Sequence, residues 1–69
     1  MLDANTVRNR LLERLAASSL NYAEAARMSG APYEHIRRIC RHGWEPPLAT
    51  ALTLCQGLEL QIEEVFWIE

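Results

Sequence analysis

The feature that most constrains this chain is the segment 21–43, which reads NYAEAARMSGAPYEHIRRICRHG. Two short patterns with helical spacing lie on either side of Gly30. The second pattern predicts a helix that buries Ile36 and Ile39. The opposite side of that helix carries Tyr33, Glu34, Arg37, Arg38 and Arg41. With Ala26 as a small contact residue, the segment predicts two helices that pack at a sharp angle across a tight turn.

Start and stop signals mark the ends of these two helices. Asn21 and Glu24 have the spacing of a capping box, in which each side chain accepts from a backbone N–H at the start of a helix. Gly30 stands where the chain must turn, and a positive φ angle is expected there. Pro32 suits the start of the next helix, which we expect to run to about residue 41 before Gly43 stops it.

Three further helices complete the predicted fold. The first is expected to run from a cap at Asp3 or Asn5 to about residue 17, with the apolar stripe Val7, Leu11, Leu12 and Leu15. After a stiff linker at 44–47, the fourth carries Leu48, Ala51, Leu52, Leu54, Cys55 and Leu58. A last helix at about 62–67 turns Val65 and Phe66 inward. No segment predicts a strand, so the expected class is all-α, with five short helices in a single domain over residues 1–69.

The net charge of −2 conceals a strong asymmetry. All seven arginines occur at or before Arg41, and the chain has no lysine. Residues 1–44 carry four acidic groups against these arginines, whereas residues 45–69 carry five glutamates and no base. Such a chain could turn its basic half toward nucleic acid and its acidic half away from it. The alternative is that each half is simply a solvated surface.

Cysteines, histidines and serines form no recognisable catalytic or metal-binding set. Cys40 and Cys55 lie in apolar helical patterns, so core thiols in a reducing compartment are favoured over a disulfide. His35, Cys40 and His42 match no zinc-binding spacing. We therefore expect no enzyme, no metal and no cofactor. The N-terminus carries no secretory signal and no apolar run approaches the roughly 20 residues of a membrane span, so we expect a cytoplasmic protein outside the membrane.

The order and spacing of these residues resemble those of a known family. Over residues 20–66, without a gap, the chain resembles the Cro/CI-type (XRE-like) helix-turn-helix DNA-binding proteins. The matching positions are Leu20, Ala26, Gly30, Ile36, Ile39, Pro46, Leu48, Ala51, Leu52, Leu54, Leu58, Ile62, Glu63, Glu64, Val65 and Phe66. The resemblance implies a compact five-helix, lambda-repressor-like domain whose helix-turn-helix spans about 22–42. The later helix of that motif would lie in the major groove of DNA.

Several positions depart from the family pattern. Tyr22 stands where the family often has glutamine, Pro32 where it often has a serine or threonine cap, and Glu59 where it has a glycine. Leu15 and Cys40 stand where many members pair an arginine with a glutamate. Losing one partner of a buried ion pair costs about 3–5 kcal/mol, whereas replacing both by apolar groups is often neutral. The joint change therefore predicts that Leu15 and Cys40 touch in the core.

Candidate base-reading residues lie on the outward side of the later helix. The resemblance implies such positions at Tyr33, Glu34 and Arg38, and Arg37 is added from its place on the helix. Arg38 is the strongest candidate, because an arginine can hold O6 and N7 of guanine together for about 1–3 kcal/mol of discrimination. The alternatives are an ion pair between Arg38 and Glu34 and a solvent-facing ring for Tyr33.

The family also implies contacts with DNA phosphates. The candidates are Asn21, Tyr22, Arg41 and Trp44. For Trp44, packing over the edge of the core is the open alternative. His35 is expected to be a hydrogen-bonded helix residue. The remaining basic side chains of the N-terminal part are expected to form the solvated face of the first helix and are not assigned to DNA: Arg8, Arg10 and Arg14.

The chain ends in an apolar run. Trp67 and Ile68 exceed what a small core needs, so the segment 62–69 is expected to join two copies of the chain. A two-fold homodimer would bind a palindromic operator in double-stranded DNA.

These features predict a small stand-alone transcriptional regulator, a repressor of a prokaryotic or phage operon. A second interpretation, from another functional class, is an antitoxin or other protein-interaction module of a toxin–antitoxin or mobile-element system. Its partner would then be a toxin or another protein. The acidic C-terminal half and the apolar tail favour this second interpretation.

Overall fold

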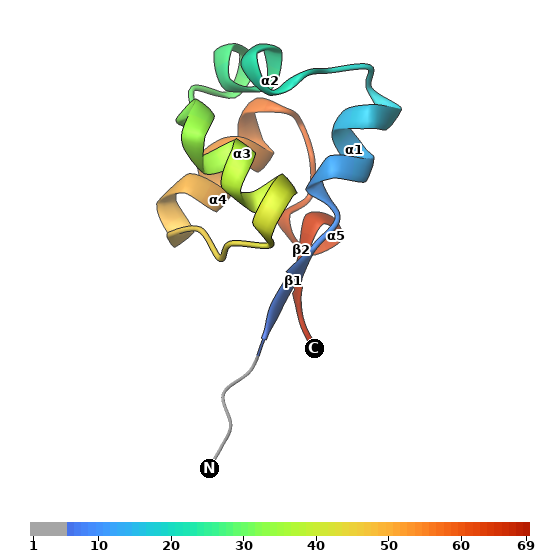
Figure 1. The fold of residues 1–69 in the computed structure, drawn as a ribbon, viewed down its shortest axis with the longest axis vertical. Coiled ribbons are helices and arrows are strands. Elements are labelled where there is room, and N and C mark those ends of the chain that lie inside the picture. The colour runs from blue at the N-terminus through green and yellow to red at the C-terminus, as the bar shows by residue number, and fades with distance from the viewer. Residues whose placement is uncertain (1–5) are drawn as a thin grey trace.

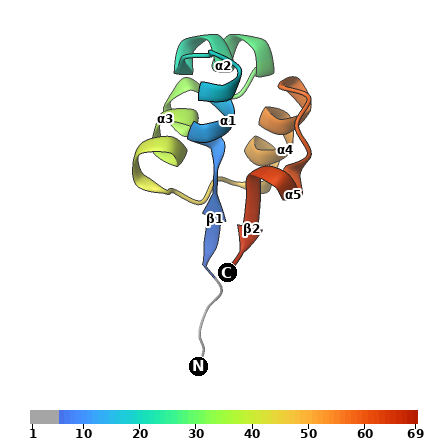
Figure 2. The same ribbon diagram turned by 90° about the vertical axis from the view of Figure 1, so that its right-hand side faces the viewer.

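Five helices and a small two-stranded sheet make up residues 6–69, the part of the chain that the computed structural model describes (Figure 1). In chain order the elements are β1 (Val7–Asn9), α1 (Leu11–Ala17), α2 (Tyr22–Ser29), α3 (Tyr33–His42), α4 (Leu48–Gly57), α5 (Ile62–Val65) and β2 (Phe66–Ile68). Figure 2 shows α3 on one side of the molecule, α4 and α5 on the other, and the sheet at the lower end. The structure is thus predominantly helical and compact, with a Cα radius of gyration of 11.6 Å.

The sheet joins segments from opposite ends of the described chain. β1 and β2 are antiparallel, with Arg8 opposite Trp67 at the centre of the register. The N–H of Arg10 donates to the carbonyl of Val65 at 2.9 Å, and that of Glu69 donates to Thr6 at 2.9 Å. These bonds hold the N-terminal segment against the C-terminal one.

The expectation of a fold without strands was wrong at both ends. Helix α1 begins at Leu11, not near residue 5, and α5 ends at Val65, not near residue 67. Val7 lies four residues before Leu11 and so extends a helical stripe, while three-residue strands are too short to show alternation. Asn9 is the residue that marks the true start of α1, because its Oδ1 accepts from the N–H of Leu11 at 3.0 Å. The predicted caps, Asp3 and Asn5, lie outside the described residues.

The core is a single cluster to which every helix contributes side chains. Its buried members are Leu11, Leu15, Ala25, Ala31, Ile36, Ile39, Leu54, Cys55 and Val65. Leu15 is only 2% exposed, and Cys40 packs against the same cluster, so both residues lie at the core. A direct contact between those two side chains stays a prediction. Three predicted core leucines are instead exposed: Leu12, Leu48 and Leu52.

The turns follow the predicted backbone signals. The capping box is present, with the N–H of Glu24 donating to Oδ1 of Asn21 at 2.7 Å and the N–H of Asn21 donating to Glu24 at 2.9 Å. Gly30 and Gly43 end α2 and α3 in the left-handed region, at φ angles of 83° and 65°. Glu59 also has a positive φ of 59°, a left-handed conformation that costs a residue with a β-carbon more than it would cost glycine. Pro32 occupies the N-cap position directly before α3, and its side chain makes no capping hydrogen bond.

Helices α2 and α4 lie in close contact at Gly57. A β-carbon placed on Gly57 would overlap the backbone of Ser29 at the end of α2 and would lie 2.8 Å from its β-carbon. Ser29 is itself held in place, since its hydroxyl donates to the carbonyl of Ala25 at 2.7 Å and accepts from the N–H of Ala31 at 3.1 Å. The small size of Gly57 therefore sets the distance between α4 and the α2–α3 pair.

We predict that Gly57→Ala destabilises the protein. Alanine favours a helix, but its β-carbon would press on a backbone that cannot rotate away, and such overpacking costs about 1–3 kcal/mol. The neighbouring exposed change Gln56→Ala serves as the control and should alter the free energy of unfolding by less than about 0.5 kcal/mol. Urea unfolding measures both, and equal midpoints for the two variants would show that the helices do not meet at Gly57.

Candidate nucleic-acid interface

The outer face of α3 displays the residues predicted to read DNA bases. Ile36 and Ile39 are 0% and 1% exposed, so the inner face of this helix is fixed against the core. Helical geometry then turns the opposite face to solvent. That face carries Tyr33, Glu34, Arg38 and Arg41, which are exposed, and Arg37, which is half-buried. The four predicted base-reading residues therefore share one surface.

Glu34 forms an ion pair with Arg37 and not with Arg38. The carboxylate of Glu34 lies 3.3 Å from a guanidinium nitrogen of Arg37. The side chains of Arg37 and Glu34 are 40% and 58% exposed, so the pair contributes only roughly 0.2–0.5 kcal/mol and water or a ligand can break it. The predicted alternative of an Arg38–Glu34 pair is absent among residues 6–69. Arg38 thus carries a charge that no described carboxylate neutralises.

Arg38 instead lies over the ring of Trp44. Its guanidinium carbon is 5.7 Å from the centroid of the indole. The other neighbour of Trp44 is the imidazole of His35, 4.8 Å away between centroids. His35 is anchored in turn, because its Nδ1 lies 3.0 Å from the hydroxyl of Thr50 on α4. These contacts join the middle of α3 to the linker and to α4.

This cluster settles how two of the predicted residues pack. Trp44 is half-buried and packs against the core, which is the alternative left open for it, and His35 is hydrogen-bonded as expected. Sequence reasoning gave no role to Thr50. The only signal for it was a hydroxyl among apolar residues of α4, since a buried hydroxyl needs a hydrogen-bond partner.

The start of α2 packs against the start of α3. The rings of Tyr22 and Tyr33 meet edge to face, with centroids 6.2 Å apart and planes at 69°. Tyr22 is half-buried and packs on the core, while Tyr33 is 48% exposed. Asn21 uses its side-chain oxygen for the capping box, so its amide nitrogen is the group left to donate to a ligand. Of the predicted phosphate contacts, Tyr22 therefore lies beside Tyr33, and Asn21 directly precedes Tyr22 at the start of α2.

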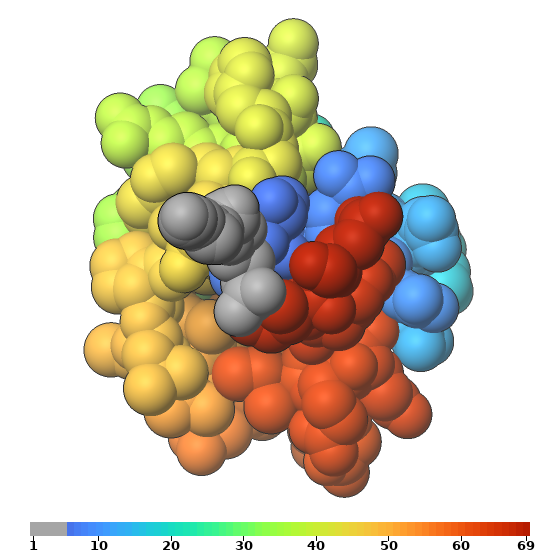
Figure 3. Space-filling view, turned by 90° about the horizontal axis from the view of Figure 1, so that it is seen from below, coloured from blue at the N-terminus to red at the C-terminus, as the bar shows by residue number. Residues whose placement is uncertain are grey.

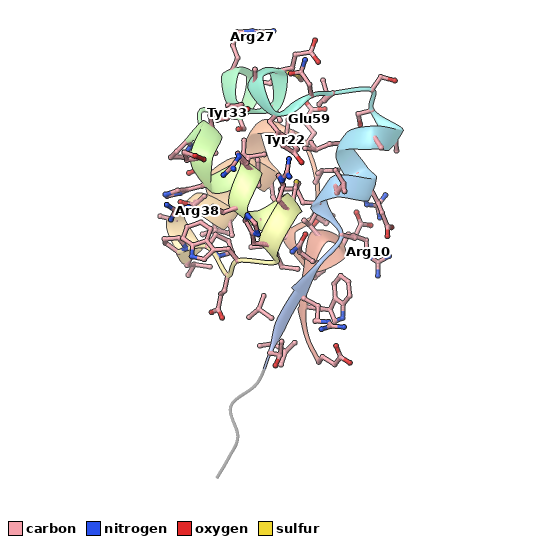
Figure 4. The ribbon with its side chains drawn as sticks, viewed as in Figure 1. Arg10, Tyr22, Arg27, Tyr33, Arg38 and Glu59 are labelled. Carbon is pink, nitrogen blue, oxygen red and sulfur yellow. The ribbon has the colours of Figure 1, made fainter. Side chains whose placement is uncertain are left out.

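Arg10, Arg27 and Arg38 lie on different parts of the molecule (Figure 4). In that view Arg38 and Tyr33 lie on the left, Arg27 projects from the upper end, and Arg10 lies at the lower right. Arg27, on the last turn of α2, is exposed, and the sequence alone predicted no function for it. It is a further cation in the basic half of the chain.

Arg8 and Arg10 are exposed as predicted, but their predicted place on the first helix was wrong. Both precede α1, and both contact the C-terminal segment. Arg8 pairs with Glu69 at 2.7 Å, and Arg10 lies 4.6 Å from the centroid of the Trp67 ring. Trp67 and Ile68 lie on β2, not in a helix, and remain 37% and 59% exposed.

Both cysteines are free thiols. Burial raises the pKa of Cys40 from 9.0 to about 11. The pKa of Cys55 is raised by burial and, to a smaller extent, by the negative charge of Glu63. Within the described chain no three His, Cys, Asp or Glu side chains gather where they could hold a metal ion. None of the helices found over residues 6–69 is long and apolar enough to cross a bilayer.

Neither a scan against protein-family models nor a search of curated proteins finds a match for this chain. A functional proposal therefore rests on how α2 and α3 are arranged and on the residues at their surfaces.

The raised pKa of Cys40 predicts a loss of stability at alkaline pH. In the unfolded chain the thiol loses its proton near pH 9, while in the folded protein it keeps the proton to about pH 11. The stabilising difference is complete below pH 9 and is lost as the pH rises from 9 to 11. Between pH 8 and alkaline pH, the urea midpoint of unfolding should therefore fall less in Cys40→Ala than in the wild type. Equal falls would contradict the assignment to Cys40.

Proposed function

We propose that this protein is a sequence-specific DNA-binding transcriptional regulator in which α2 and α3 act as a helix-turn-helix. The observation that carries the proposal is the outer face of α3, where Arg38 faces solvent beside Tyr33, Glu34 and Arg37. The left-handed turn at Gly30 supports it, because such a turn lets a second helix cross the first and project its outer face. We infer a lambda-repressor-like domain that carries an added two-stranded sheet.

In this proposal α3 enters the major groove and Arg38 reads a base. A guanidinium can donate two parallel hydrogen bonds to O6 and N7 of guanine. Trp44 supports the side chain from one side, which lowers the number of conformations it must give up on binding. Glu34 can accept from the amino group of cytosine once its exposed pair with Arg37 opens.

Phosphate contacts would fix the orientation of α3 in the groove. Asn21 and Tyr22 can donate from the start of α2, and Arg41 and the indole N–H of Trp44 can donate from the end of α3. These groups lie at opposite ends of the base-reading residues, so they would hold the backbone on both sides of the site. The acidic C-terminal half would face away from the DNA.

A homodimer would let two copies of α3 read a palindromic operator. Trp67 and Ile68 supply exposed apolar surface for it on β2. We propose a small repressor of a prokaryotic or phage operon, controlled by its own concentration. The second candidate, an antitoxin or other protein-interaction module, is favoured by one observation: α4 carries exposed leucines and no charge.

Selection of bound duplexes from a random pool tests the base-reading role of Arg38. Arg38→Ala should lose preference at one or two base positions, at a cost of about 1–3 kcal/mol there. The matched change Arg41→Ala should weaken binding to all sequences alike and reduce the salt dependence by about one phosphate. Uniform weakening by Arg38→Ala would assign that residue to a phosphate, and failure of the wild type to select any sequence would contradict the proposal.

Sedimentation equilibrium tests the dimer. We expect the wild type to associate and Ile68→Asp to remain monomeric, because a charge at an apolar interface is left without water or a partner. Leu12→Asp, at an exposed leucine on α1, is the control and should associate normally. A wild type that stays monomeric at high concentration would exclude pairing through β2.

A further inference from the structure

Helix α4 is the one helix of the described chain without any charged side chain, yet it lies at the surface. Its sequence is LATALTLCQG. Ala51 and Leu54 are buried, but Leu48 is 69% exposed and Leu52, one turn later, is 39% exposed. A helix that is apolar on its outer face as well as its inner one is normally covered on both. Residues 6–69 leave the outer face of α4 uncovered.

A trough runs beside Leu48. Its first part is a hollow of about 190 Å³ lined by the apolar side chains Val7, Pro46, Leu48, Ala51, Ile62 and Phe66. Past Ile62 and Phe66 it continues into a second hollow of about 270 Å³, which Trp67 and Ile68 of β2 also line. Figure 3 shows the molecule from below, with the linker and α4 on the left and α5 and β2 on the right. We call the two hollows together the α4 trough.

The charges that line the α4 trough all have one sign. Glu45 borders the first hollow and Glu63 borders the second, and no basic side chain from residues 6–69 lines either. Neither carboxylate forms an ion pair with a described residue. The segment that builds most of the trough, residues 45–69, has five glutamates and no base. The trough is therefore apolar at its floor and acidic at its rim.

We propose that the α4 trough binds a basic amphipathic helix of a second protein. The apolar stripe of such a helix would cover Leu48 and fill the two hollows. Its lysines or arginines, on the flanks of the stripe, would face Glu45 and Glu63. This binding goes beyond the proposed DNA recognition and does not depend on it, since α4 and α5 lie on the other side of the molecule from α3 (Figure 2).

Charge and size argue against other occupants. The homodimer proposed through Trp67 and Ile68 would use the far end of the second hollow. A two-fold pairing that reached Leu48 as well would bring Glu45 and Glu63 of both copies into one interface, where like charges repel. A small molecule that filled one hollow, of about 190 or 270 Å³, would leave the other uncovered, whereas a helix can cover both. DNA carries the same sign of charge as the rim.

A synthetic peptide of leucine and lysine, with leucines at i, i+3, i+4 and i+7 and a fluorescent label, is the probe. We expect its anisotropy to rise with wild-type protein and the affinity to fall by roughly tenfold or more in Leu48→Gln, because an apolar contact is lost. The matched control is Leu12→Gln, at a leucine 51% exposed on α1, which should bind as the wild type does. Both leucines are exposed, so neither change should unfold the protein.

A second pair of variants tests the charge. Glu63→Gln should weaken binding of the peptide and reduce its salt dependence, while Glu13→Gln on α1 should change neither. A scrambled peptide of the same composition, without an apolar stripe, should bind much more weakly than the amphipathic one. Equal binding of the two peptides would show simple attraction to an acidic protein and would overturn the proposal.

Three further results would also overturn it. The first is no binding of the amphipathic peptide, or equal binding to the wild type and Leu48→Gln. The second is self-association that Leu48→Gln abolishes, which would assign the trough to a second copy. The third is binding of the peptide only after residues 1–5 are removed, which would show that the chain's own N-terminus occupies the α4 trough.

Discussion

The burial of Ile36 and Ile39 determines how this molecule presents its charge. The two side chains are almost completely enclosed, and they lie on the same face of α3. Rotating α3 would expose both and would bury arginines in an apolar cluster, which a domain of this size cannot stabilise. The outward direction of Arg38 follows from the core and not from any contact that Arg38 itself makes.

The rest of the fold holds that helix in place. Gly57 allows α4 to approach the α2–α3 pair, and the hydrogen bond between Thr50 and His35 joins α4 to α3. The pairing of β1 with β2 fastens the N-terminal segment to the C-terminal one. As a result the basic face of α3 and the acidic α4 trough lie on different sides of one rigid core. Two different partners could therefore bind at the same time.

The helices and turns were predictable because each has a local signal, such as the capping box at Asn21 or the glycine at Gly30. The side chains that face outward from α3 were predictable from helical spacing alone. The sheet was not, because three-residue strands have no measurable alternation and their pairing is a contact between distant segments. The partners of Trp44 and the exposure of Leu48 also depend on tertiary packing, which an apolar pattern does not specify.

The most direct test of DNA binding through α3 is chemical-shift mapping of the isotope-labelled protein with a duplex DNA that it selects. Backbone amides report each region of the surface separately, so the two faces can be compared in one titration. We expect perturbations that gather at the start of α2, along α3 and at Trp44, with α4 and α5 little changed. Perturbations centred on α4 and α5, with α3 unaffected, would contradict DNA binding through α3.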